Sequence, residues 1–262
     1  MSKLLNGKVA IVTGGAKGLG YGISRALASE GASVLISGRD GAAAETVAAE
    51  IERDFGSKAI GIAGDMGVKE DVLAMVQRAV DSFGGLDILV NNASLLSAGV
   101  LLEDKTDEML RRTLEIGVWG NWWAMQAAFP HMKKRGGGSV INFSSIDAQT
   151  GAWLHSDYNI NKLGIEGLTR SAAVEWGRFN IRVNAILPGI VEGPRMHKVI
   201  ADRAAQLGLS HEAMEERYLE KVSLRRMVSP YDVADMVAFL LSAAGASISG
   251  QSLGVDGNVE TL

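Results

Sequence analysis

The sequence predicts an α/β fold, in which a parallel β-sheet is covered by helices on both faces. Short apolar runs rich in β-branched residues alternate with longer segments of helical periodicity along most of the chain. A glycine-rich turn directly follows the first apolar run. The chain has 262 residues, of which 47% are hydrophobic and 21% charged, enough for one well-buried core. We therefore expect a single domain over residues 1–262.

Seven apolar runs are expected to form the strands of this sheet. In chain order they cover residues 9–12, 33–37, 59–62, 86–90, 139–143, 182–187 and 253–255. The glycines of 136–138 are typical of a turn into the fifth strand. Between 193 and 228 the alternation breaks, and two short helices are expected there. Such a segment could serve as a lid over a substrate.

The glycine-rich turn has the composition of a phosphate-binding loop. The first strand ends at Thr13 and is followed by Gly14, Gly15, Gly18 and Gly20, after which the pattern becomes helical. Glycines let the backbone approach a pyrophosphate closely, and the helix N-terminus directs unpaired N–H groups and partial positive charge at the phosphates. Strand, glycine turn and helix together predict a dinucleotide site and a single-domain Rossmann-type, doubly wound parallel sheet of about seven strands.

Composition excludes several other classes of function. Lys and Arg total 26 against 30 Asp and Glu, so the net charge of −4 gives no sign of a nucleic-acid or anionic-membrane partner. The absence of cysteine excludes disulfides, thiolate metal sites and cysteine nucleophiles. The four histidines do not fall at metal-ligand spacings, so we expect no metal. The N-terminal residues contain no apolar stretch typical of a signal peptide, and we expect a cytoplasmic protein without membrane spans.

Three residues in the second half of the chain form a candidate catalytic group. Tyr158 and Lys162 lie four apart in a segment with helical pattern, so their side chains project from one face. A tyrosine pKa near ~10 is too high for a base at neutral pH, and a neighbouring ammonium is expected to lower it. Ser145 follows the fifth expected strand and offers a second hydroxyl. Alone, a Tyr-x-x-x-Lys pattern recurs by chance.

Taken together, these motifs resemble the classical short-chain dehydrogenase/reductase family over essentially the whole chain. The resemblance runs from Thr13-Gly-Gly-Ala-Lys-Gly-Leu-Gly20 through Asp65, Asn91-Asn-Ala93, Ser145, Tyr158, Lys162 and Pro188-Gly189 to Gly250-Gln-Ser-Leu-Gly-Val-Asp-Gly257. It implies a seven-stranded doubly wound sheet, a nicotinamide cofactor without a metal, a carbonyl or secondary-alcohol substrate, and usually a homotetramer.

The resemblance also implies roles for individual residues. Tyr158 would be the general acid/base, Ser145 would hold the substrate oxygen, and Lys162 would lower the tyrosine pKa and bond the nicotinamide ribose. Asp65 would meet the adenine, Asn91 would support the central strand and the cofactor, and residues 188–191 would border the nicotinamide. The complete expected cofactor site is Gly14, Lys17, Gly18, Leu19, Gly20, Arg39, Asp65, Met66, Asn91, Tyr158, Lys162, Pro188, Gly189 and Val191.

One position departs from the family pattern. Family members usually carry an asparagine in the helix after the fourth strand, and its backbone helps to hold a proton-relay water. Here Gly117 stands at that place, in Glu115-Ile-Gly-Val-Trp-Gly120. Glycine could preserve a backbone contact and tolerate the helix distortion that such a site needs. A different register or a weakened relay are the alternatives.

Charge at the end of the second expected strand bears on the choice of cofactor. NAD sites usually place an acidic residue there to bond the ribose hydroxyls. Here the strand ends in Gly38 followed by Arg39, and Lys17 adds a second cation from the glycine turn. Both suit a 2′-phosphate, so we expect NADP(H), with NAD(H) as the alternative. Alternatively, Arg39 is a solvated arginine balanced by Asp40, and Lys17 a turn lysine in water.

The sequence says less about the substrate. Candidate pocket residues are those of 94–96, Asp147, the 151–155 turn and Met196. Asp147, Trp153 and His155 could bind a polyhydroxylated or polar ring substrate, or could equally be a solvated carboxylate, a packed indole and a surface imidazole.

The tryptophans Trp119, Trp122 and Trp123 fall on a helix that forms a subunit interface in this family, although packing against the sheet would explain them as well.

Two other classes of protein share this fold. A non-catalytic dinucleotide-binding sensor would keep the glycine turn but would not need Ser145, Tyr158 and Lys162 together. A lyase such as a halohydrin dehalogenase would be expected to lose the phosphate-binding glycines and to replace the lysine with arginine. The chain retains both features, which favours the reductase interpretation.

Overall fold

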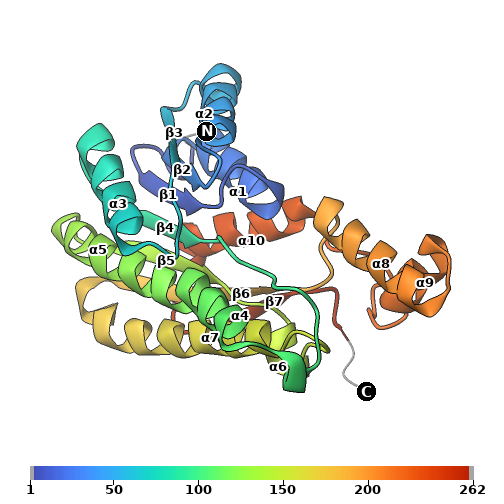
Figure 1. The fold of residues 1–262 in the computed structure, drawn as a ribbon. Coiled ribbons are helices and arrows are strands. Elements are labelled where there is room, and N and C mark those ends of the chain that lie inside the picture. The colour runs from blue at the N-terminus through green and yellow to red at the C-terminus, as the bar shows by residue number, and fades with distance from the viewer. Residues whose placement is uncertain (1–2, 260–262) are drawn as a thin grey trace.

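The computed structural model describes residues 3–259, so the two ends of the expected domain lie outside the described residues. Its centre is a seven-stranded sheet with the order β3-β2-β1-β4-β5-β6-β7, in which every neighbouring pair is parallel. The order reverses between β1 and β4, as in a doubly wound sheet (Figure 1). The strands are β1 Val9–Thr13, β2 Ser33–Gly38, β3 Ala59–Ala63, β4 Ile88–Asn91, β5 Gly138–Phe143, β6 Ile181–Pro188 and β7 Ser252–Val255.

The predicted strands are confirmed, with one shift of two residues. The fourth strand begins at Ile88 rather than Leu86. Asp87 leads into it: its N–H bonds to the Val9 carbonyl (3.0 Å), and its carbonyl accepts from the Ser139 N–H (2.9 Å). The turn at 136–138 is also present, with positive φ at Gly136 (80°) and Gly137 (150°).

Helices cover both faces of the sheet (Figure 1). Along β1, Ala10 and Val12 pack toward α1, α2 and α10, whereas Val9 and Ile11 pack toward α3, α5 and α7. This alternation buries both faces of the strand, as expected for a parallel sheet. The helices are α1 Gly18–Ser29, α2 Gly41–Phe55, α3 Lys69–Phe83, η1 Leu102–Asp104, α4 Asp107–Leu114, the π-helix η2 Glu115–Trp119, α5 Gly120–Lys134, α6 Asp147–Thr150, α7 Ser156–Trp176, η3 Gly177–Phe179, α8 Pro194–Leu207, α9 His211–Leu219, α10 Pro230–Leu241 and η4 Ala243–Gly245.

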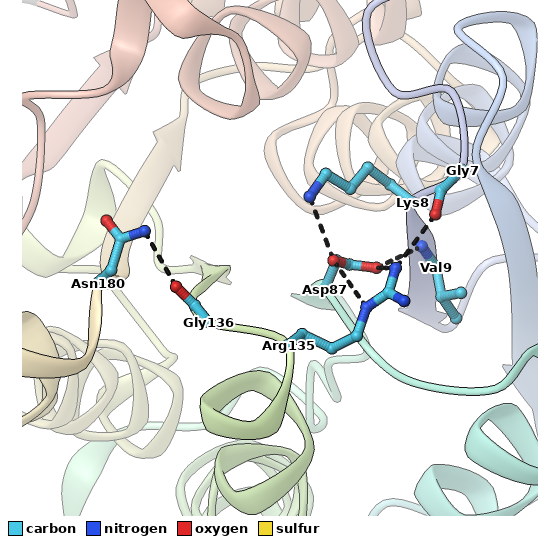
Figure 2. A network of polar contacts seen from close by, with 7 residues as sticks. All are labelled: Gly7, Lys8, Val9, Asp87, Arg135, Gly136 and Asn180. Atoms are coloured by element: carbon cyan, nitrogen blue, oxygen red, sulfur yellow. Dashed lines mark hydrogen bonds and ion pairs between the residues drawn. The ribbon is translucent and has the colours of Figure 1, made fainter.

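A buried charge cluster joins the strands at the amino end of the sheet (Figure 2). Asp87, whose side chain is 5% exposed, accepts hydrogen bonds from Lys8 Nζ (3.2 Å) and the Val9 N–H (3.0 Å). Arg135, after α5, donates from Nη2 (2.9 Å) and Nε (3.3 Å) to the same carboxylate. Burial alone would raise the pKa of Asp87, but Arg135, Val9 and Lys8 hold it below its usual value. The cluster is fully paired and lies away from the carboxyl ends of the strands.

Helices α8 and α9 are the two short helices expected between 193 and 228. They project at the side of the sheet (Figure 1) and share a small apolar cluster of Ile200, Ala204 and Met214. The two main apolar clusters, one on each face of the sheet, are much larger. Few buried contacts therefore stabilise the α8–α9 hairpin. Within residues 3–259, no helix combines the length and apolar character needed to cross a bilayer.

Candidate active site

The carboxyl ends of the strands bring the expected site residues to one edge of the sheet. The glycine turn follows β1, Asn91 ends β4, Ser145 lies two residues beyond β5, and Pro188 ends β6. Ligands of doubly wound sheets bind at this edge, next to the point where the strand order reverses. Beyond β6, the Gly189 N–H bonds to the Val255 carbonyl (3.0 Å), and Val191 forms a bridge with Val228 at the base of α8 and α9.

The glycine turn has the geometry of a phosphate cradle. Gly14 and Gly18 have positive φ (62° and 52°), and a Cβ on Gly20 would lie 2.1 Å from the Gly14 carbonyl oxygen. Leu19 packs against the core and anchors the start of α1. Lys17, the residue before α1, provides no side-chain cap, and the first turn of the helix has no acidic residue. The amide groups of this helix start therefore suit a pyrophosphate.

A neighbouring asparagine, Asn92, holds this turn in place. Asn92 Nδ2 donates to the carbonyls of Thr13 (2.9 Å) and Gly14 (3.2 Å), while the Thr13 hydroxyl accepts from the N–H groups of Asn92 and Ala93 (3.0 Å each). Asn91, which was expected to support the central strand and the cofactor, donates across the sheet to Asn142 Oδ1 of β5 (2.8 Å). The adjacent Asn-Asn pair was the available signal, but strand alternation decides which of the two faces the turn.

The end of β2 places cations where the adenosine ribose is expected. Arg39 is exposed, and its charge lowers the pKa of Asp65. Lys17 Nζ lies 3.9 Å from Asp40 Oδ2, and both side chains are largely exposed. Asp40 also caps α2 by accepting from the Ala43 N–H (3.0 Å). The acidic residue nearest this strand end is thus engaged with a helix N-terminus and with Lys17.

Asp65 and Met66 follow β3 beside the same site. Asp65 accepts from the Gly67 N–H (2.8 Å) and from Arg112 Nη2 of α4 (2.5 Å). Burial raises the pKa of Asp65, but these donors hold it below its usual value. Met66 is buried against α5, where a Cβ on Gly120 would lie 2.5 Å from its carbonyl oxygen. Arg112 had no sequence signal, because it reaches this position from a later helix.

Ser145, Tyr158 and Lys162 lie together beyond the end of β5. Tyr158 and Lys162 occupy one face of α7, and Lys162 Nζ is 5.2 Å from the centre of the Tyr158 ring. The lysine side chain is buried and donates to the Phe143 carbonyl at the end of β5 (2.7 Å). The Ser145 hydroxyl accepts from the Asp147 N–H (3.2 Å) and donates to Asp147 Oδ2 (3.3 Å).

Burial dominates the ionisation of this group. It raises the pKa of the Tyr158 phenol, an effect that the positive charge of Arg195 partly offsets. Burial, together with the positive charge of Arg195, lowers the pKa of Lys162 to about 7. From the sequence, the pKa of Tyr158 was expected to be lowered by its lysine. The net direction in the structure is the opposite, because the loss of water outweighs the charge of Arg195. Arg195, at the start of α8, is a site residue that the sequence argument missed.

Several polar groups lie among the residues that were expected to form the substrate pocket. Burial raises the pKa of Asp147, and the Ser145 hydrogen bond offsets this only in part. Burial and then the charge of Lys105 lower the pKa of His155, whose Nδ1 has no hydrogen-bond partner among residues 3–259. Trp153 is largely exposed. The guanidinium of Arg203, from α8, lies over its ring, 4.1 Å from the ring centre. Met196 belongs to the partly buried rim of the α8–α9 cluster.

The start of α7 is fixed by a buried ion pair. Asp157, next to Tyr158, accepts from Lys105 Nζ (2.8 Å), the Ser97 hydroxyl (2.6 Å) and the Thr113 hydroxyl (2.8 Å). These bonds tie the loop after β4 and helix α4 to the tyrosine helix. Holding Tyr158 and Lys162 on a fixed element restricts their positions, as a proton-transfer site would require.

Gly117 lies in a π-helical turn, Glu115–Trp119, between α4 and α5. The expected helix distortion is therefore present. A π-turn widens the helix and is common near functional sites. Trp119, at the end of this turn, and Trp122, in α5, are 52% and 45% exposed, and Trp119 packs against Trp123 with ring centres 6.0 Å apart.

Two histidines that are distant in the sequence meet on the α8–α9 hairpin. Ligand atoms of His197, His211 and Glu215 lie within 4.8 Å of one another. The spacing of the histidines in the sequence did not predict this group, because His197 belongs to α8 whereas His211 and Glu215 belong to α9. The expectation of a metal-independent reaction stays a prediction.

The family comparison matches nearly the whole chain. A family model described as enoyl-(acyl carrier protein) reductase covers residues 14–259. Human dehydrogenase/reductase SDR family member 4 is 35% identical over 253 residues, which are 97% of this chain and 87% of the relative.

Solved structures agree with this match. L-Sorbose reductase from Gluconobacter frateurii, complexed with NADPH and L-sorbose, superposes with a TM-score of 0.94 at 31% identity and full coverage of both chains. An NAD⁺-bound xylitol dehydrogenase gives a TM-score of 0.91 at 28% identity, covering 97% of this chain and 99% of the other.

Proposed function

The chain belongs to the short-chain dehydrogenase/reductase family and is an NAD(P)-dependent oxidoreductase of alcohol or carbonyl substrates, and from this premise we propose that it uses NADP(H) with Tyr158 as general acid/base. The observation that carries the proposal is the meeting of Ser145, Tyr158 and Lys162 at the carboxyl end of β5, beside the glycine turn after β1. The bound nicotinamide supplies hydride to a carbonyl carbon, or accepts it from an alcohol.

The remaining work is proton transfer and charge stabilisation by the protein. When a carbonyl is reduced, negative charge develops on its oxygen, and the Tyr158 O–H donates its proton there. The Ser145 hydroxyl donates a hydrogen bond to the same oxygen and stabilises the developing charge. The raised pKa of Tyr158 keeps the phenol protonated before the reaction, and an ammonium at Lys162 stabilises the phenolate that remains.

The charges near β2 support NADP(H). Arg39 and Lys17 offer a planar fork and an ammonium, and Asp40 is directed to the start of α2. We expect kcat/KM to be about tenfold or more higher with NADPH than with NADH, since a desolvated phosphate contact contributes about 1.5–3 kcal/mol. Arg39→Ala should lower this preference, and Lys3→Ala, which removes an exposed lysine before β1, should not. A higher kcat/KM with NADH would contradict the proposal.

Hydroxylated ketones and polyols are the first substrates to test. Asp147, His155 and Arg195 would give a substrate both hydrogen-bond acceptors and a cation around the reacting carbon. L-Sorbose and xylitol, after which two structurally similar enzymes are named, belong to this class.

The deciding experiment compares the wild type with Tyr158→Phe. NADPH oxidation is followed by absorbance with panels of ketones, diketones, sugars and hydroxysteroids. Loss of the phenolic proton should lower kcat by about a thousandfold, while the Kd for NADPH stays within a few-fold. Unchanged turnover in the variant would refute the assigned acid/base. Cofactor binding without turnover on any panel would favour the non-catalytic sensor.

We also propose a homotetramer, in line with the family expectation. Besides the exposed Trp119 and Trp122, α7 exposes Ile160, Leu163 and Val174, so apolar side chains are available on both helices. Sedimentation of the wild type and of Trp122→Asp would test it, and a monomeric wild type would contradict it.

A further inference from the structure

Gly117 and Asn161 interlock where the π-helix packs on the tyrosine helix. A Cβ built on Gly117 would lie 2.0 Å from Asn161 Oδ1, 2.3 Å from Nδ2 and 2.5 Å from Cγ. Gly117 does not have a positive φ, so its backbone conformation does not require glycine. Residue 117 therefore lacks a side chain because the Asn161 amide fills that space.

Asn161 lies between the two catalytic residues of α7, three positions after Tyr158 and directly before Lys162. Its side chain is fully buried, yet neither Oδ1 nor Nδ2 has a hydrogen-bond partner among residues 3–259. A buried amide without a partner costs free energy, and such groups in native proteins commonly hold an internal water molecule. Packing alone would be served as well by a small apolar residue.

The surrounding backbone suits such a water. The π-turn Glu115–Trp119 interrupts the regular i→i+4 bonding of the helix, and polar backbone groups in such turns are open to other partners. A second close contact, in which a Cβ on Gly164 would lie 2.9 Å from Val118 Cγ2, keeps α7 against this turn. The amide, the widened turn and Lys162 are thus held in one small region.

We propose that Asn161 is a positioning residue whose amide holds a buried water that exchanges protons with Lys162. In the family pattern described above, the backbone of an asparagine at the position of Gly117 helps to hold such a water. This proposal rests on the function proposed above. During carbonyl reduction Tyr158 gives one proton to the substrate oxygen, and one proton from solvent enters through this water to restore the Tyr158–Lys162 pair. No other bond forms or breaks in this exchange, and oxidation of an alcohol runs the same path in reverse.

The test moves the amide from one helix to the other. Asn161→Ser removes it, Gly117→Asn forces a second side chain into the same space, and the double variant Gly117→Asn/Asn161→Ser restores one amide and one small residue. We expect kcat to fall about 30-fold in Asn161→Ser and further in Gly117→Asn, with KM within threefold for the serine variant. The double variant should recover to within about threefold of the wild type, a coupling that independent sites do not give.

A second readout separates proton transfer from packing. If the water serves Lys162, the solvent deuterium isotope effect on kcat should increase in Asn161→Ser and return to the wild-type value in the double variant. Gly164→Ala strains the same helix contact without touching the amide, so it should lower the thermal unfolding midpoint and leave the isotope effect unchanged.

Several outcomes would overturn the proposal. Asn161→Ser with unchanged kcat and isotope effect would show that the amide has no part in proton transfer. The same holds if a folded double variant that binds NADPH normally stays as slow as Asn161→Ser. If the double variant does not fold, the isotope effect of Asn161→Ser decides alone. Failure of the proposed function is separate, since it would appear as a fully active Tyr158→Phe enzyme.

Discussion

The two ends of the sheet treat buried polar groups in opposite ways. At the amino end, Asp87 accepts hydrogen bonds from Lys8, Val9 and Arg135, and these donors hold its pKa below the usual value (Figure 2). At the carboxyl end, burial lowers the pKa of Lys162 to about 7 and raises the pKa of both Tyr158 and Asp147. Buried polar atoms without partners among residues 3–259 lie there on Asn91, Ser94, His155 and Asn161, whereas Ser139 Oγ is such an atom near the amino end.

This difference separates stability from function within one fold. The amino end pairs its charges, so they contribute to folding. At the carboxyl end Asp157 is also paired with Lys105, but Tyr158, Lys162 and Asp147 are groups whose charged forms burial disfavours. The large apolar core on either face of the sheet offsets this cost. Groups with shifted pKa values in a cleft are the ones suited to proton transfer at neutral pH. Substitutions at the two ends should therefore have opposite effects on stability and activity.

The largest effect is expected from Lys162→Met. The substitution keeps most of the length of the side chain but removes the ammonium, so kcat should fall about a thousandfold. Because a buried charge with little compensation is lost, the free energy of unfolding near pH 6 should stay the same or rise by about 1 kcal/mol. Steady-state kinetics and urea unfolding at pH 6 measure both. A variant that is active but less stable would show that Lys162 serves stability, as Asp87 does, rather than proton transfer.

The pH dependence of stability sharpens this test. The pKa of Lys162 is lowered from its usual 10.5 to about 7, so between these values the unfolded chain binds a proton that the native protein does not. Wild-type stability should therefore gain a contribution as pH rises from about 7 to 9, and Lys162→Met should lack it. If the free energy of unfolding depended on pH in the same way in the two proteins, burial would not disfavour the charged form of Lys162.

Gly20→Ala should have the next largest effect. A Cβ there would lie 2.1 Å from the Gly14 carbonyl oxygen, so the glycine turn must shift and its amides lose their alignment. We expect NADPH affinity to fall about 100-fold and stability to fall by about 2–3 kcal/mol. Gly22→Ala is the matched control on the same helix, because its nearest atoms are 3.8 Å away, on Pro230. Fluorescence titration with NADPH would contradict the prediction if both variants bound equally.

Asp87→Asn should act on stability alone. The amide cannot accept both charged donors, so we expect a loss of about 2 kcal/mol at pH 7 with kcat/KM unchanged per folded molecule. Since the pKa of Asp87 is held below its usual 3.8, its contribution is complete above about pH 4 and is lost as pH falls through the lowered value. The difference between the two proteins should accordingly shrink toward pH 2–3. A reduced kcat/KM in this variant would show that the charge cluster around Asp87 also influences the active site at the carboxyl end of the sheet.

Local sequence patterns predicted much of this molecule. The strands were placed within two residues because apolar runs of β-branched residues, bounded by turn residues, carry their own signal. The glycine turn and the pair Tyr158–Lys162 were visible for the same reason, since the residues that define them are close in sequence.

Contacts between distant segments could not be predicted in this way. Asn92, which was not named as a site residue, bonds the glycine turn because the pleat at the end of β4 directs it to that face. Arg195 acts on the catalytic group from α8. This helix belongs to the α8–α9 hairpin, which has few core residues and no regular alternation of strand and helix. Gly117 was recognised as a departure, but its meaning lies in Asn161 on another helix. Burial, which no short motif reports, also set the direction of the tyrosine pKa.

The smallest expected effect gives the most direct comparison, because the same substitution is made at the other end of the sheet. The pKa of Asp147 is raised above its usual 3.8 by burial, so the native protein holds a proton there that the unfolded chain has already lost. Its ionisation therefore costs stability as pH rises through that window, and Asp147→Asn should raise the free energy of unfolding at pH 7 by about 1 kcal/mol.

Activity should change only modestly in the same variant. The asparagine can still accept from the Ser145 hydroxyl, which donates to Asp147 Oδ2 at 3.3 Å, so we expect kcat/KM within about tenfold of the wild type. Urea unfolding of Asp87→Asn and Asp147→Asn at pH 7, measured side by side, should give shifts of opposite sign. If both variants were destabilised, the carboxylate at the carboxyl end would have to be paired as the one at the amino end is, and Asp147 would be a structural residue that fixes Ser145 rather than a costly group kept for the substrate.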